Sequence, residues 1–257
     1  MPYVKRTTRA GNTVEIEYYY TSRYNKKGQT RADRVKPTRE TQKKVNKRQA
    51  ERKLRLLLNA NFAYGDYHVV LDYIRDKEKP DRTKEEMQQD IAKFLRELRK
   101  EYKKAGKELK YIHVMEIGSK GARHHHLVIN KLDTEVLQRA WYKAYEGHNR
   151  VKVFPLDDSG NYADLASYLL KYTEEHRKDD EGALMSKRYN CSRNLVRPEP
   201  EYEIVTERAY YRVSQNPKAP KGYYILPDSV QQGVHSADYY GYGWYRYTMI
   251  KLDKRGG

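Results

Sequence analysis

Residues 111–130, YIHVMEIGSKGARHHHLVIN, contain the pattern that decides the fold. It predicts one strand over Tyr111–Ile117 and a second over His124–Asn130, with Gly118 and Gly121 in the turn between them. The stretch is therefore expected to form a β-hairpin.

Three polar side chains of this hairpin are expected to share one face. Side chains alternate along a strand, so His124 and His126 lie on one face while His125 lies on the other. A register that places Glu116 of the first strand beside the two histidines brings two imidazoles and one carboxylate together. Such a set leaves coordination positions open, as a catalytic divalent metal requires. Consecutive histidines also occur in exposed polar patches and at packed strand ends, so this alternative stays open.

The charge of the chain favours a polyanionic partner, nucleic acid before membrane. Its 257 residues include 52 Lys and Arg against 35 Asp and Glu, which gives a formal net charge of +17. Residues 1–58 hold 17 of the basic residues and 5 of the acidic ones. We expect this segment to contact DNA, largely through a basic helix between Thr30 and Leu58, although a solvated basic face is the other interpretation.

The sequence also indicates the compartment. No apolar run is long enough to span a bilayer, and the first residues lack the apolar core of a signal peptide. The single cysteine, Cys191, excludes an internal disulfide and fits a reducing compartment. We therefore expect a cytoplasmic protein without a membrane partner.

Further strands and helices are expected around the hairpin. They are a strand over Tyr67–Tyr73, a helix from the capping box of Thr83 and Glu86 to near Gly106, a helix capped by Asp133, a strand at Val151–Val153 and a helix over Tyr162–His176. This order predicts an α+β fold with an antiparallel central sheet and flanking helices.

Three segments are expected along the chain. They are the basic segment 1–58, a core over 59–180, and a tyrosine-rich extension over 181–257 that packs on the core. Ten of the 26 tyrosines lie between Tyr202 and Tyr247, and the extension is expected to form strands around Glu203–Val213.

The helix over Tyr162–His176 carries three candidate residues on one face. Tyr168 and Lys171 are three positions apart, and Tyr168 and Tyr172 are four apart. A tyrosine with a pKa of about 10 is a poor nucleophile unless a nearby cation stabilises the phenolate. The alternative is a core helix with half-buried tyrosines.

One ordered set of residues resembles the HUH endonuclease superfamily, and specifically the rolling-circle replication initiators of small phages and plasmids. The set is Glu116, His124–His126 and Tyr168-Leu-Leu-Lys171-Tyr172. The resemblance covers roughly residues 59–197. Three further segments add to it: NFAYGDYHVVLDY, KYIHVMEIG and KRYNCSRNL.

The resemblance implies a metal-dependent nick in single-stranded DNA. His124, His126 and Glu116 would hold Mn²⁺ or Mg²⁺, and Tyr168 would attack the phosphate, leaving a 5′-phosphotyrosine and a 3′-OH primer. Lys171 would stabilise charge, and Tyr172 stands at the spacing of a second nucleophile. The middle position of the histidine motif is normally hydrophobic, so His125 is a departure and a shifted register in which it faces the metal stays open.

The resemblance also implies partners. They are single-stranded origin DNA, and a host helicase and polymerase in a bacterial cytoplasm, since the chain has no P-loop motif of its own. Arg188, Arg193 and Arg197 are candidate DNA contacts, or else part of a solvated loop. The alternative functions are a non-catalytic nucleic-acid-binding protein on the same fold and a transposase of the same chemistry.

Overall fold

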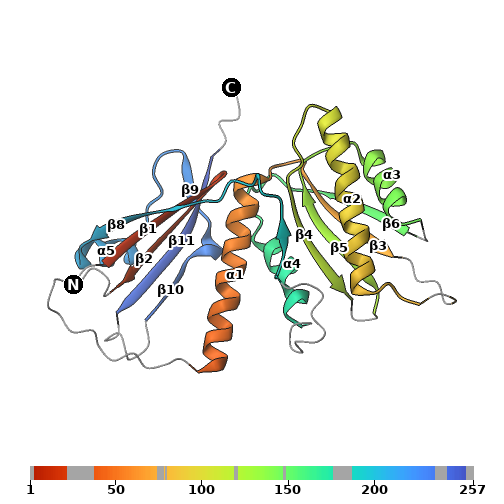
Figure 1. Ribbon diagram of the computed structural model, residues 1–257. Coiled ribbons are helices and arrows are strands. Elements are labelled where there is room, and N and C mark those ends of the chain that lie inside the picture. The colour runs from red at the N-terminus through yellow and green to blue at the C-terminus, as the bar shows by residue number, and fades with distance from the viewer. Residues whose placement is uncertain are drawn as a thin grey trace. The chain divides into compact units, whose positions relative to one another are not determined.

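The predicted hairpin forms the middle of a five-stranded antiparallel sheet. Its strands are β4 (Tyr111–Ile117) and β5 (Arg123–Ile129), and the strand order of the sheet is β6-β3-β5-β4-β7. Every neighbouring pair is antiparallel. The prediction of an α+β fold with an antiparallel central sheet is therefore confirmed (Figure 1).

The structure, a computed structural model, describes most of the chain. The described residues are 3–21, 38–73, 78, 80–118, 121–146, 149–175, 187–234 and 242–252, without the side chains of 172–175. Two units are distinguished by their internal contacts. The central unit is Asn61–Val196, and the terminal unit combines Met1–Ala60 with Arg197–Gly257.

The central unit has the predicted order of strand, helix, strand, strand, helix, strand and helix. Besides β4 and β5, its elements are β3 (Tyr67–Tyr73), α2 (Lys84–Lys104), α3 (Thr134–Ala144), β6 (Asn149–Pro155), α4 (Ala163–Glu175) and the short β7 (Asn190–Cys191). The predicted helix starts are confirmed, because Thr83 and Glu86 form a capping box and the Asp133 side chain caps α3.

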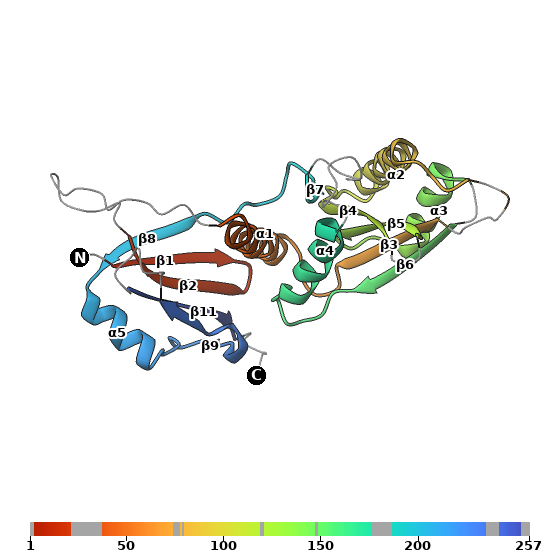
Figure 2. The ribbon, with the colours of Figure 1, turned by 90° about the horizontal axis from the view of Figure 1, so that it is seen from below.

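The two faces of the central sheet are covered differently. Helices α2 and α3 lie together on one face (Figure 2), where Phe94 and Trp141 join Leu71 and Leu127 of the sheet in one buried core. Full burial of an apolar side chain of this size contributes about 1.5–3 kcal/mol. The other face carries polar side chains of β3, β5 and β6, and α4 supplies part of its surroundings. The candidate site lies on this second face.

The terminal unit is built around a second antiparallel sheet with the order β10-β11-β2-β1-β8, in which β9 also pairs with β11. Its elements are β1 (Tyr3–Ala10), β2 (Thr13–Tyr20), α1 (Arg39–Asn61), β8 (Pro200–Val205), α5 (Glu207–Gln215), β9 (Tyr223–Ile225), the 3₁₀ helix η2 (Pro227–Ser229), β10 (Gln231–Val234) and β11 (Gly243–Lys251). Strands from both ends of the chain thus share one sheet.

Helix α1 is anchored by its C-terminal half. Leu54 and Leu58 are fully buried, and Arg52 and Arg55 both form ion pairs with the buried carboxylate of Glu15 on β2. Burial alone would raise the pKa of Glu15, but the two guanidinium groups outweigh it and lower the pKa. By contrast, residues 39–49 of the same helix are exposed.

Tyrosine takes the place of phenylalanine in the core of the terminal unit. Tyr3 and Tyr210 stack with ring centroids 4.3 Å apart, and Tyr18, Tyr245 and Tyr247 are buried in the same cluster. Stacked rings of this kind are worth about 0.5–1.5 kcal/mol beyond the area they bury. Part of the tyrosine excess therefore has a structural explanation.

Three features differ from the sequence expectation. The stretch expected to form strands around Glu203–Val213 is a strand only as far as Val205, because Thr206 caps the helix α5 that follows. The helix expected from Thr30 begins at Arg39, and residues 30–37 lie outside the described part of the chain. Lastly, residues 1–58 and 181–257 were expected to be two different segments, whereas their strands share one sheet, in which β1 pairs with β8 and β2 pairs with β11.

No described helix combines the length and the apolar composition that crossing a membrane requires.

Candidate metal centre and the neighbouring tyrosine

The β4–β5 register brings the predicted acid and histidines together. Glu116 is directly opposite His124, and His126 is two positions further along β5 on the same face. One oxygen of Glu116, Oε2, lies 2.8 Å from Nε2 of His126 and 3.3 Å from Nε2 of His124. The ligand atoms of the three residues all lie within 4.8 Å of one another.

The donor set of this triad fits a divalent ion. Burial alone would raise the pKa of Glu116, but hydrogen bonds with His124 and His126 outweigh it and lower the pKa to about 2. The site therefore offers an ionised carboxylate at neutral pH beside the two histidine rings, with room for further ligands from the pocket beside it. Two nitrogens and one oxygen suit Mn²⁺, tolerate Mg²⁺ and would also hold Zn²⁺.

His68 is a residue of this site that the sequence analysis missed. It lies on β3, and its Nε2 is 3.0 Å from Nδ1 of His126. Burial, together with the neighbouring His126, lowers the pKa of His68 to about 4, so its ring is neutral at physiological pH. The alternation along Tyr67–Tyr73 indicates the face of His68, but only the pairing of β3 with β5 places it beside His126.

His125 lies on the opposite face of the sheet. Its Nε2 is 2.9 Å from the hydroxyl of Tyr73 and its Nδ1 is 3.0 Å from Nε2 of His113, and both histidines are buried. This register excludes the shifted arrangement in which His125 would face the metal. In the middle position the imidazole packs inside the core with its polar atoms hydrogen-bonded.

Helix α4 places Tyr168 beside the triad. Ala166, Leu169 and Leu170 hold the helix by their burial, while Tyr168 remains 41% exposed. Its ring centroid is 5.3 Å from that of His126 and 6.0 Å from that of His68. Tyr168 is thus on the histidine face of the sheet and outside the hydrophobic core.

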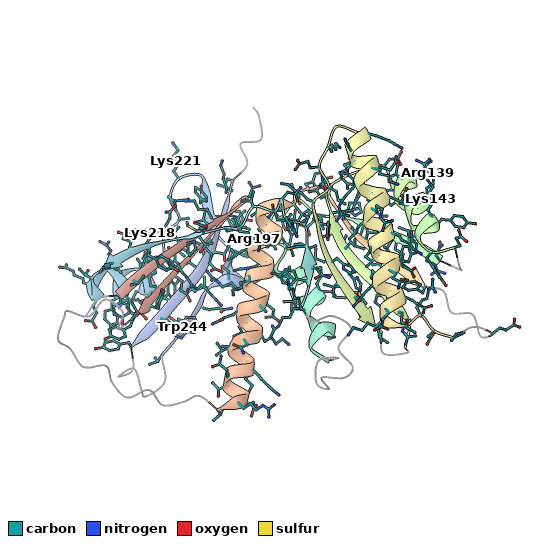
Figure 3. All side chains as sticks on the ribbon, in the orientation of Figure 1. Arg139, Lys143, Arg197, Lys218, Lys221 and Trp244 are labelled. Atoms are coloured by element: carbon teal, nitrogen blue, oxygen red, sulfur yellow. The ribbon has the colours of Figure 1, made fainter. Side chains whose placement is uncertain are left out.

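The other predicted site residues are placed differently. Lys171 is exposed one helical turn beyond Tyr168, and Tyr172 belongs to α4 although its side chain lies outside the described part. Arg188 is half-buried and Arg193 is exposed, whereas the exposed Arg197 belongs to the terminal unit (Figure 3). None of the three arginines is among the described residues that line the pocket at the triad.

A pocket of about 800 Å³ opens beside the triad. Its lining from the sheet and the β4–β5 turn comprises His68, Val70, Asp72, Tyr73, Ala122, Arg123, His124, His126, Arg150, Lys152 and Phe154. Helix α4 adds Asp164, Leu165 and Tyr168. The pocket therefore combines candidate metal ligands, a candidate nucleophile, cations and an aromatic ring.

Comparison with known proteins gives one match. Residues 66–177 match the family model of Replication-associated protein ORF2/G2P. The matched segment runs from just before β3 to just beyond α4, so it contains the triad, His68 and Tyr168. No curated protein and no solved structure matches the chain. The match supports a replication initiator, and hence DNA as a partner.

Proposed function

We propose that this protein initiates rolling-circle replication by nicking single-stranded origin DNA. Tyr168 is the nucleophile, and a divalent ion, Mn²⁺ or Mg²⁺, is held by Glu116, His124 and His126. The observation that carries the proposal is that Tyr168 and the two histidines line one pocket, with Glu116 within hydrogen-bonding distance of both histidines. The family match and the ordered resemblance to HUH endonucleases support the same assignment.

The reaction is a transesterification at phosphorus. The phenol oxygen of Tyr168 attacks the phosphorus and the bond to the 3′ oxygen breaks. The phenol proton passes to solvent, and the departing oxygen takes up a proton to become the 3′-OH. The 5′ side stays bound to Tyr168 as a phosphotyrosine ester. Since one phosphodiester replaces another, a 3′-OH can attack this ester and rejoin the strand.

The protein groups have separate tasks in this reaction. Glu116, His124 and His126 hold the ion, which polarises the scissile phosphate as a Lewis acid when it is bound. Lys171, one turn from Tyr168 on α4, adds a positive charge on the side of the helix where the phenolate forms. Tyr172, four residues from Tyr168, is the candidate for a second nucleophile in strand transfer.

The proposal also implies host partners and a cellular location. The 3′-OH primes synthesis by a host polymerase, and a host helicase unwinds the duplex in the cytoplasm of a bacterial host. A protein that binds DNA on this fold without cutting it is the competing function, and an HUH transposase is another.

The decisive experiment looks for the covalent adduct. The protein is incubated with Mn²⁺ and a pool of single-stranded oligonucleotides that tile the DNA around its own coding region, and products are separated on a denaturing gel. We expect an adduct that survives denaturation and that Tyr168→Phe abolishes, because the variant lacks the attacking oxygen.

Tyr142→Phe is the matched control. Tyr142 is 62% exposed on α3, the helix on the other face of the sheet, so its removal should leave the adduct unchanged. An adduct that persists in Tyr168→Phe and disappears in Tyr172→Phe would move the nucleophile to Tyr172. DNA binding without any adduct would favour the non-catalytic protein.

A further inference from the structure

Strand β6 presents an unusual face to the pocket. It is the edge strand of the central sheet, paired on one side with β3. Arg150, Lys152 and Phe154 are alternate residues, so they share one face, and all three are exposed and line the pocket of the triad. Two cations and an aromatic ring thus follow one another along a line that leads to the candidate nucleophile.

Phe154 is exposed where a phenylalanine is normally buried. The chain has 3 phenylalanines, and the other two, Phe62 and Phe94, are 4% and 0% exposed, whereas Phe154 is 50% exposed. Leaving half of such a ring in water forgoes part of the free energy that its full burial would provide. The ring centroid of Phe154 is 5.8 Å from that of His68, and the ring centroid of His68 is 6.0 Å from that of Tyr168. An exposed flat ring at this place is suited to stack on an unpaired base.

The two cations extend the face away from Phe154. Lys152 forms a 2.6 Å ion pair with Asp72 of β3, and Arg150 is directly opposite Asp72 in the β3–β6 register. In the pocket lining as a whole, Arg123, Arg150 and Lys152 stand against the carboxylates of Asp72 and Asp164, which leaves a net positive charge for a phosphate. Same-face residues of a strand are about 6.8 Å apart, a spacing similar to that of neighbouring phosphates in an extended single strand.

We propose that single-stranded DNA runs along this face of β6, with one base stacked on Phe154 and the next phosphates on Lys152 and Arg150. The inference rests on the proposed function, since it gives the path of the DNA strand that would be cut in that same pocket. It requires a single strand rather than a duplex, because paired and stacked bases do not offer a face to Phe154. The bound strand then leads its scissile phosphate to Tyr168.

Binding without metal tests this inference separately from cleavage. Fluorescence anisotropy of a labelled oligothymidylate is measured in EDTA, so that no nicking interferes. We expect Phe154→Ala to weaken binding about tenfold, because the variant loses the stacking contact with one base. Phe154→Tyr should bind as the natural protein does, while Phe154→Leu, which keeps an apolar side chain but has no ring, should be weakened like the alanine variant.

The two cations are tested against a matched pair. Arg150→Gln with Lys152→Gln should lower the slope of log affinity against log salt by up to about 1.4, since each phosphate contact on a single strand accounts for about 0.7. Arg139→Gln with Lys143→Gln removes the same two residue types from exposed positions on α3, on the other face of the sheet (Figure 3), and should leave the slope unchanged.

Each result has a defined meaning. Unchanged affinity in both Phe154→Ala and Phe154→Leu, or equal losses from the two cation pairs, would overturn the inference even if the natural protein forms the covalent adduct. The expected binding pattern without an adduct would leave this strand site standing and overturn the nicking function.

Discussion

The two ring nitrogens of His126 have different partners. Nε2 faces Glu116 at 2.8 Å, and Nδ1 faces Nε2 of His68 at 3.0 Å. If His126 held an ion through Nε2, the nitrogen that faces Glu116, then Nδ1 would carry the proton and would donate to Nε2 of His68. Because the ring of His68 is neutral at physiological pH, its Nε2 could accept this hydrogen bond from Nδ1 of His126. We therefore propose that His68 is a positioning residue, which would fix the tautomer and the ring orientation of the ligand His126.

Mn²⁺ titration calorimetry without DNA tests this arrangement. His124→Ala with His126→Ala should abolish binding, because only one ligand of the triad remains. His68→Ala should weaken binding about 10–100-fold, as is typical when the partner of a ligating histidine is lost. His68→Gln should recover most of the affinity, since its amide oxygen can accept the same hydrogen bond. Unchanged Mn²⁺ affinity in the double variant would show that the ion binds elsewhere.

The consecutive histidines of β5 lie on opposite faces of the sheet. On the core face, His125 links His113 of β4 to Tyr73 of β3, and the Tyr73 hydroxyl donates to Asp90 of α2 at 3.3 Å. This buried network fixes β5 between its neighbours. A polar group left without its partner there would cost about 1–3 kcal/mol. The network therefore supports the strand that positions His124 and His126.

The pH dependence of stability follows from this network. Burial lowers the pKa of His113 to about 3, whereas in the unfolded chain it titrates near 6.5. As the pH falls from 6.5 towards 3, only the unfolded chain binds this proton, so the free energy of unfolding decreases by up to about 1.4 kcal/mol per pH unit. His113→Gln lacks this titration.

Urea unfolding at pH 7, 6 and 5 measures the effect. We expect His113→Gln to be less stable than the natural protein at pH 7, by a margin that shrinks as the pH falls. A margin that stays constant over this range would contradict a neutral, buried His113.

At the scale of the whole molecule, the net charge of +17 is unevenly placed. The exposed half of α1, residues 39–49, carries Arg39, Lys43, Lys44, Lys47 and Arg48 against a single acid, Glu40. It contains no aromatic residue on which a base could stack. This half of the helix is therefore suited to phosphates rather than to unpaired bases, and we propose it as the DNA contact of the basic N-terminal segment.

Salt-dependent binding to duplex DNA tests that contact. Replacing Lys43, Lys44, Lys47 and Arg48 with Gln should lower the slope of log affinity against log salt by up to about 3.6, at 0.9 per phosphate. Adduct formation on single-stranded DNA should be unchanged. The same replacement at Lys93, Lys100, Lys103 and Lys104, which are exposed on α2, is the control. Equal losses from both sets would indicate only a general effect of net charge.

The sequence by itself determined what depends on local order. Alternation placed His124 and His126 on one face of a strand and His125 on the other, and helical spacing predicted α2, α3 and α4. The Thr83 and Glu86 capping box was readable because its partners are only three residues apart. The α+β class followed from the order of these elements.

Only the tertiary structure decided which distant segments meet. The pairing of β3 with β5 brought His68 to His126, and the pairing of β3 with β6 brought Lys152 to Asp72. Likewise, β1 and β2 joined the sheet of β8 and β11 from the other end of the chain. Strand pairing is made by backbone hydrogen bonds that every residue offers, so no local pattern specifies the partner. The partner is chosen by burial of the whole sheet, which is a property of the assembled fold.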